Sequence, residues 1–304
     1  VLSNLKLRTS WGRAGTDNIG QFQYMSAYGT GGDAVFGGQN PEIAPGYTET
    51  RFPNPNITWE TSEMFNIGID ASFFNGKLNL EAVWFYKKTN DILRERTDMP
   101  AILGYKLPAA NVGKVDNRGI DLNITHRNHL RDFNYSIAGN LTWARNKVID
   151  LLEPAGEKNN PRQRSTGHSM SQYFGYEALG LFQSDEEANN WPQPQFGKAK
   201  AGDIKYKDQN GDGIIDAEDE IAIGRSNYPE LVYGLNLNAE WKGFDITFFF
   251  QGAALADFYY NGYLAFPYIE GRGGALLEHH IGNTWTPENP KAEFPRLYLS
   301  LIHI

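Results

Sequence analysis

The stretch Gly202–Gly252 reads GDIKYKDQNGDGIIDAEDEIAIGRSNYPELVYGLNLNAEWKGFDITFFFQG. Its first part is an acidic loop rich in the oxygen ligands that hard divalent cations prefer. Its second part holds two runs of alternating apolar and polar residues, 231–241 and 244–251, with a turn at Lys242-Gly243. Alternation with a period of two is the pattern of a β-strand with one apolar face. The stretch therefore predicts a surface loop followed directly by a β-hairpin.

The acidic loop has the spacing of an EF-hand loop. Positions 1, 3, 5, 7, 9 and 12 are occupied by Asp208, Asn210, Asp212, Ile214, Asp216 and Asp219, with Ile214 offering its backbone carbonyl. Gly213 stands at position 6, where the chain must turn sharply. We predict a structural Ca²⁺ site, weakened because Asp219 is shorter than the usual Glu. The alternative is a double Asn-Gly and Asp-Gly turn that needs no metal.

Other segments repeat the alternating pattern at 65–74, 77–88, 120–125 and 134–143. Asn75-Gly76 predicts a tight hairpin turn between the first two, and a second short turn is expected near Leu130–Asp132. The apolar face of each segment is also rich in aromatic residues. Segments of about 9–11 residues are long enough to cross a bilayer as tilted strands.

Between these pairs lie long connections at 17–60, 89–117, 146–230 and 253–296. Short turns at one rim and long loops at the other are typical of outer-membrane barrels. We therefore predict an all-β fold that forms part of a large antiparallel transmembrane β-barrel with long extracellular loops. A soluble β-sandwich, which also alternates, is the alternative.

Composition restricts the function classes. A net charge of −8 argues against a nucleic-acid binder, and the lack of cysteine excludes disulfides and thiolate metal sites. The sequence contains no run of 18 apolar residues, so it predicts no transmembrane helix. The glycine-rich segments 12–15 and 29–32 do not form a phosphate-binding motif, so no organic cofactor is expected. Ser165 and Ser169 lie near His168 without the nucleophile elbow of a hydrolase, so we predict no enzyme activity.

Six segments, in order along the chain, resemble SusC/RagA-type TonB-dependent transporters of the Bacteroidota outer membrane. They are NPNITWETSEMFNIGIDASFFNGKLNLEAVWFYKKTNDIL (54–93), NVGKVDNRGIDLNITHRN (111–128), FNYSIAGNLTWARNKVIDL (133–151), GYEALGLFQSDEEA (175–188), GDIKYKDQNGDGIIDAEDEIAIG (202–224) and WTPENPKAEFPRLY (285–298). The resemblance implies a roughly 22-stranded barrel integral to the outer membrane, with an N-terminal plug. It further implies import of oligosaccharides or peptides under a SusD-like surface lipoprotein, driven by the TonB complex.

On this resemblance, residues 1–298 are expected to be the C-terminal portion of the barrel, incomplete at both ends. The plug and the segment that contacts TonB are not in the sequence. The last residues, 299–304, read LSLIHI, which is the in-frame translation of the end of a common transposase sequencing adaptor. We predict that these residues are a library artefact.

An aromatic segment in the last long connection is predicted to contact substrate or the lipoprotein lid: Phe258, Tyr259, Tyr260, Tyr263 and Tyr268. Ordinary packing within the loop is the alternative. Ser184 and Glu187 form a capping box that predicts a short helix, with Trp191 packing nearby.

Two other functions stay open at this point. One is a TonB-dependent receptor for siderophores or cobalamin. The other is a secreted, calcium-dependent β-sandwich adhesin or glycan-binding module, which would be soluble without detergent.

Overall fold

The computed structural model describes the chain except for residues 18, 39–40, 95–107, 154–159, 161, 163, 261–264, 266–275 and 298–304. The described chain forms two compact units. The sheet unit comprises Val1–Lys158, Ser165–Met170 and Pro229–Leu255, and the loop unit comprises Asn159–Arg164, Ser171–Tyr228 and Ala256–Ile304. No helix in the described ranges has the length and apolar character that crossing a membrane requires.

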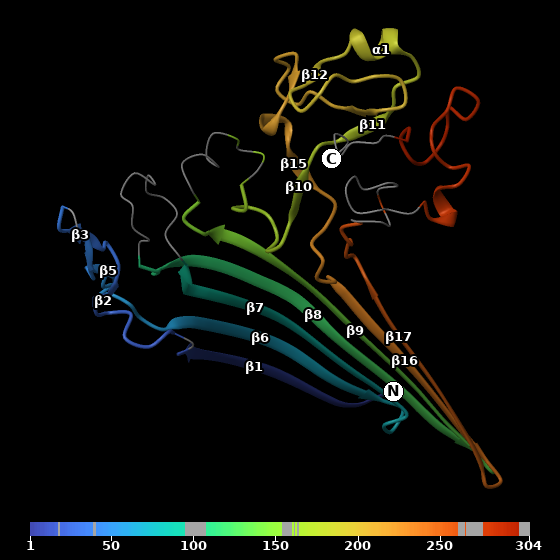
Figure 1. Cartoon of the computed structure of the whole chain (residues 1–304). Helices are drawn as coiled ribbons and strands as arrows, with labels where there is room; N and C mark the ends of the chain where they lie inside the picture. Colours follow the sequence, from blue (N-terminus) through green and yellow to red (C-terminus); the bar gives the residue numbers. More distant parts are fainter. Residues whose placement is uncertain are drawn as a thin grey trace. The chain divides into compact units, whose positions relative to one another are not determined.

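Long antiparallel strands build the sheet unit. Within the described residues its main sheet has seven strands in the order β1-β6-β7-β8-β9-β16-β17 (Figure 1). The bounds are Leu2–Thr16 (β1), Glu60–Phe73 (β6), Leu78–Arg94 (β7), Ala110–Leu130 (β8), Phe133–Asp150 (β9), Leu231–Trp241 (β16) and Phe244–Ala254 (β17). The predicted all-β class is confirmed, and β7, β8 and β9 extend well beyond the predicted segments.

The hairpin turns all lie at one rim of the sheet. Lys242 (φ 45°) and Gly243 (φ 85°) connect β16 to β17 as predicted, with both central residues in the left-handed region. β8 and β9 are joined through Arg131 and Asp132. The β6–β7 turn is longer than predicted, because pairing ends at Phe73↔Leu78 and leaves four residues in the loop.

Cross-strand register gives the sheet one apolar and one polar face. Directly paired residues share a face and the next row of pairs occupies the other. One row of the apolar face reads Ile67, Trp84, Ile120, Trp143 and Leu231. One row of the polar face reads Asp70, Glu81, Asn123, Asn140, Gly234 and Gln251.

The apolar face has no second sheet packed on it within the described residues. Phe244 is 77% exposed and Phe250 is 56% exposed. A soluble sandwich would bury such rows against a facing sheet about 10 Å away. The exposed apolar face therefore fits a barrel wall that contacts lipid.

The opposite rim of the sheet unit carries the long connections. Between β1 and β6, two small antiparallel ladders form from β2 (Ala27–Thr30) with β5 (Tyr47–Arg51), and from β3 (Ala34–Phe36) with β4 (Glu42–Ala44). The sheet unit thus has short turns at one rim and long connections at the other, as the sequence predicts.

The loop unit is a set of short elements. They are Tyr173–Gly175 (β10), Ala178–Leu181 (β11), Asp185–Asn189 (α1), Gln193–Pro194 (β12), Ile204–Tyr206 (β13), Ile214–Ile215 (β14), Ala217–Asp219 (η2), Ile221–Ile223 (β15) and Glu278–His280 (η4). Its small core packs Trp191 against Phe182, Ala188 and Ala199. The predicted capping residue is confirmed, since the Ser184 hydroxyl accepts the Glu187 N–H at 3.1 Å.

Candidate functional site

The acidic loop connects β13 to β15 within the loop unit and contains β14 and η2. Its first residue, Asp208, folds the chain around its own carboxylate, which accepts the N–H groups of Gly211 at 2.5 Å and Gly213 at 2.9 Å. Both glycines have positive φ, 78° and 85°, which only glycine adopts without strain. The predicted sharp turn at Gly213 is therefore confirmed.

Asp219 closes the loop from its other end. Its side chain is fully buried. It accepts backbone N–H groups from Gln209 at 2.7 Å and from Asp216 at 3.0 Å. Asp216 in turn caps η2 by accepting the Glu218 N–H at 2.8 Å. Because one buried carboxylate holds both ends of the loop, Asp219 has a structural role whether or not metal binds.

Two side chains, those of Asn160 and Arg162, form a strap that fixes the same loop. Asn160 Nδ2 donates to the Ala217 carbonyl at 2.7 Å, and Arg162 Nη2 donates to the Glu218 carbonyl at 2.8 Å. No sequence pattern pointed to this strap, because its residues contribute only single polar side chains to a distant segment.

The predicted calcium ligands thus lie on one compact loop, where Asp212 and Asn210 also accept backbone N–H groups. In the described part of the chain, no three His, Asp or Glu side chains converge closely enough to hold a metal ion. The donor chemistry suits Ca²⁺, but backbone N–H groups already engage these oxygens. Calcium binding stays a prediction.

The charge of Asp208 is stabilised locally. Burial alone would raise the pKa of Asp208, but the backbone N–H groups of Gly213 and Gly211 outweigh it and hold the pKa below its usual range. The loop therefore keeps this carboxylate ionised at neutral pH, as cation binding would require.

The aromatic segment is only partly described, since Tyr263 and Tyr268 lie outside the described residues. Phe258 is 81% exposed, the largest exposed fraction among the three described residues. Tyr259 stacks on Tyr173 with ring centroids 5.8 Å apart. The Tyr260 hydroxyl lies 3.3 Å from His279 Nε2. Two of the three therefore make ring or hydroxyl contacts within the loop unit, and Phe258 is the most exposed of them.

A second aromatic cluster escaped sequence reasoning. Tyr176 contacts Tyr206 and Phe196, with ring centroids 5.2 Å and 5.7 Å away. Burial, together with the negative charges of Glu220 and Asp216, raises the pKa of Tyr176 to about 12. Tyr206 lies in β13, whereas Tyr176 and Phe196 lie in two separate connecting segments, so no single sequence motif could have identified the cluster.

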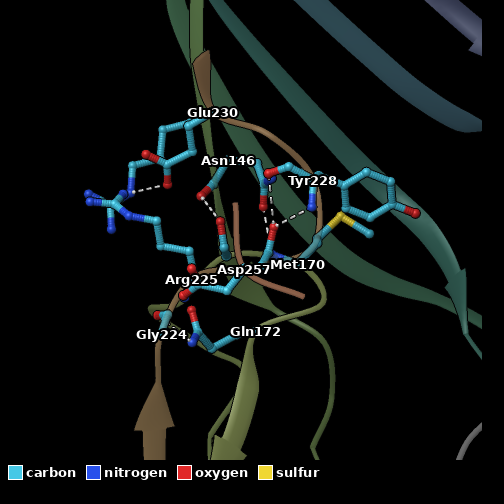
Figure 2. Close-up of polar contacts among 11 residues, drawn as sticks. Asn146, Met170, Gln172, Gly224, Arg225, Tyr228, Glu230 and Asp257 are labelled. Carbon is cyan, nitrogen blue, oxygen red and sulfur yellow. Dashed lines mark hydrogen bonds and ion pairs between the residues drawn. The ribbon is translucent and has the colours of Figure 1, made fainter. Parts of the chain in front are cut away.

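Side-chain amides and a carboxylate hold the ends of the long connections (Figure 2). In the loop unit, Gln172 Nε2 donates to the carbonyls of Ile223 at 2.9 Å and Gly224 at 3.1 Å, and Asp257 accepts the Arg225 N–H at 2.6 Å. In the sheet unit, Asn146 Oδ1 accepts the Met170 N–H at 2.6 Å. Such contacts fix where each loop leaves its anchoring strand.

The sheet unit also has an open groove of about 790 Å³ at its hairpin rim. Its lining combines polar side chains, among them Lys77, Arg127, His129, Glu240 and Asp245, with the apolar-face residues Tyr135, Ala239 and Ile246. The sequence gives no signal for this groove.

Comparisons with known proteins match this architecture. The family model described as "TonB dependent receptor-like, beta-barrel" matches residues 1–217. TonB-dependent receptor P26 of Formosa agariphila is 33% identical over 97% of this chain and 30% of its own length. TonB-dependent receptor SusC of Bacteroides thetaiotaomicron is 27% identical over 93% of this chain and 28% of its own length.

Among solved structures, the RagAB peptide importer in its open-open state aligns with a TM-score of 0.73 at 22% identity, over 98% of this chain and 31% of that chain. The chain therefore spans less than a third of the length of these relatives. The resemblance to SusC/RagA-type receptors and the predicted barrel fold are confirmed by these matches.

Proposed function

Because the chain belongs to the TonB-dependent receptor-like β-barrel family, we propose that it forms wall strands and external loops of a SusC-type importer in the bacterial outer membrane. The observation that carries the proposal is the division of one long-stranded sheet into an apolar face and a polar face. Lipid would cover the first face and the barrel lumen would lie against the second.

The activity is transport rather than catalysis. A substrate is held above the barrel by a SusD-like lipoprotein lid, and energy from the TonB complex acts on a plug to open a passage. The sheet unit supplies the wall of that passage, and the loop unit supplies a surface for the lid or the substrate. Exposed Phe258 is a suitable contact, because aromatic faces pack against sugar rings and anchor protein interfaces.

The proposed substrates are oligosaccharides or peptides. The solved structure titled a peptide importer supports the peptide class, and the resemblance to SusC/RagA-type transporters supports the oligosaccharide class. A structural Ca²⁺ in the Asp208–Asp219 loop is part of the proposal, and it would stiffen the loop unit. Its ligands would be the side chains of Asp208, Asn210, Asp212, Asp216 and Asp219 and the backbone carbonyl of Ile214.

The test is uptake by living cells. Wild-type cells, cells without this receptor and cells without TonB would be given fluorescent pools of oligosaccharides and of peptides. We expect uptake of one pool to require both the receptor and TonB. Unchanged uptake of both pools would contradict the proposal, and loss of siderophore or cobalamin uptake instead would favour the alternative receptor class.

A further inference from the structure

The apolar face of the sheet unit does not stay apolar up to the rim with the long connections. Near that rim it carries five basic side chains, which we call the basic belt: Arg13, Lys88, Arg118, Arg145 and Lys147. All are exposed. A belt of cations on the face assigned to lipid is unexpected, because charge in the hydrocarbon region of a barrel is destabilising.

The register places the belt on that face unambiguously. The row of the belt nearer the long connections reads Arg13, Glu63, Lys88, Asp116 and Lys147 across β1, β6, β7, β8 and β9. The row beneath it reads Trp11, Phe65, Tyr86, Arg118 and Arg145 on the same strands. Rows on one face are two residues, or about 7 Å, apart. Four cations of β7, β8 and β9 therefore gather in two adjacent rows.

Side-chain contacts agree with this placement. Lys88 Nζ lies 5.7 Å from the ring centroid of Tyr86, and the Tyr86 hydroxyl donates to Asp116 at 2.5 Å. The Arg145 guanidinium pairs with Glu230 at 3.2 Å. The contacts of Tyr86 with Lys88 and Asp116 join the two rows on one face, and Glu230 contacts the belt from just before β16.

The belt has more positive than negative charge. Within its two rows the carboxylates are Glu63 and Asp116, and Glu230 lies just before β16 and pairs with Arg145, against five cations. Arg118 lies directly opposite Arg145, an arrangement of like charges that destabilises a sheet on its own. An anion bound between them would remove this cost. Arginine pairs favour phosphate in particular, because each guanidinium can donate two parallel hydrogen bonds.

The depth of the belt identifies the source of that anion. Trp11 and Tyr86 share the lower row of the belt, and Trp84 and Trp143 lie in the row immediately below it. Together these side chains have the character of an interfacial aromatic girdle. Farther down, the rows of this face are mostly aliphatic and aromatic, with His126 and Asn128 as polar exceptions near the hairpin rim. Charges level with a girdle or one row above it lie near the lipid headgroups.

We propose that the basic belt binds the phosphate groups of an anionic lipid in the leaflet next to the long loops. Its acyl chains lie on the apolar rows below, and Arg118 and Arg145 grip the phosphate from adjacent strands. This inference rests on the proposed function, since it requires the apolar face to lie in a membrane.

The experiment uses the complete receptor, purified in an uncharged detergent and titrated with diphosphoryl lipid A or its dephosphorylated form by native mass spectrometry. We expect the phosphorylated lipid to bind about 10-fold more tightly. The double substitution Arg118→Gln with Arg145→Gln should abolish that difference. The matched control, Arg131→Gln with Lys242→Gln, removes two exposed cations at the hairpin rim and should leave it intact.

A second double substitution, Lys88→Gln with Lys147→Gln, tests the belt if the arginine variant does not fold, as judged by heat-modifiable gel mobility. Three results would overturn the lipid site. The receptor could bind both lipid forms with equal affinity, or the control variant could lose the affinity difference as fully as the arginine variant. Millimolar inorganic phosphate could also displace the lipid. These outcomes leave the proposed function standing if the receptor still fractionates with the outer membrane. A receptor absent from that fraction would instead contradict the proposed function itself.

Discussion

Arg296 holds Asp203 through two hydrogen bonds, Nε to Oδ1 at 2.5 Å and Nη2 to Oδ2 at 3.3 Å. The two side chains are 22% and 8% exposed. The Arg296 N–H also donates to the Gly202 carbonyl at 2.9 Å. These contacts attach the segment after η4 to the start of β13, although the paired residues are far apart in sequence.

The first prediction concerns this pair. Arg296→Gln leaves a mostly buried carboxylate without its cation, which costs about 3 kcal/mol. The backbone hydrogen bonds donated by Trp285, Phe294 and Arg296 should then open, with amide hydrogen exchange roughly 100-fold faster at these positions. Exchange measured by mass spectrometry on the complete receptor checks this.

Lys291→Gln is the matched control, since Lys291 is an exposed cation in the same segment. It should leave exchange unchanged. If both variants exchange equally fast, or neither differs from wild type, the pair does not hold the segment.

The second prediction concerns close packing in the wall. A Cβ atom on Gly119 would sit 2.5 Å from Phe85 Cζ, and closer still to the Trp143 carbonyl oxygen. Gly119→Ala must shift the backbone or the Phe85 ring, which typically costs about 1–3 kcal/mol. We expect a lower temperature midpoint for loss of the compact form on unboiled gels.

Gly139→Ala supplies the comparison, because its Cβ would meet only the Gly234 carbonyl oxygen at 3.9 Å. Its midpoint should match that of wild type. A Gly119→Ala receptor as heat-resistant as this control would show that both the backbone at Trp143 and the Phe85 ring shift at little cost.

The third prediction is a pH dependence of the acidic loop. The pKa of Asp208 is lower in the folded loop than in an unfolded chain, where Asp has a pKa of about 3.9. The stabilisation is therefore complete above that value and is lost as pH falls through the lower folded pKa. After correction for intrinsic rates, amide exchange at Gly211 and Gly213 should accelerate at about pH 3 relative to pH 6. Asp208→Asn should remove this pH difference, and an unchanged difference in that variant would assign it to another group.

The fourth prediction is calcium binding. Titration calorimetry of the complete receptor should give a dissociation constant of about 10⁻⁴–10⁻³ M, in the range of extracellular calcium modules. Asp212→Ala should weaken binding at least 10-fold, while Asp245→Ala at the hairpin rim should not. The absence of calcium binding, or equal weakening by both substitutions, would leave the loop as a metal-free double turn.

Sequence periodicity predicted the strands well only where one face of the sheet is apolar. Residues 89–94 and 110–117 were assigned to a connection, yet they belong to β7 and β8. Lys87, Lys88, Thr89 and Asn90 interrupt the apolar alternation there, because above the aromatic girdle neither face needs apolar side chains. Pairing continues through backbone hydrogen bonds, which leave no periodic signal in the side chains.

The loop unit was harder to predict for a different reason. The Gly213 turn and the Ser184 cap depend on neighbouring residues, and local sequence identified both. The strap from Asn160 and the Arg296–Asp203 pair connect residues far apart in the chain. Such contacts depend on the folded arrangement of short segments, so no local motif indicates them.

The most direct test of the account is membrane fractionation of the complete receptor, followed by gel mobility with and without boiling. The account predicts partition into the outer membrane and a compact band that unfolds only on boiling. A soluble, monomeric protein that needs no detergent would contradict the account and would favour a calcium-dependent adhesin.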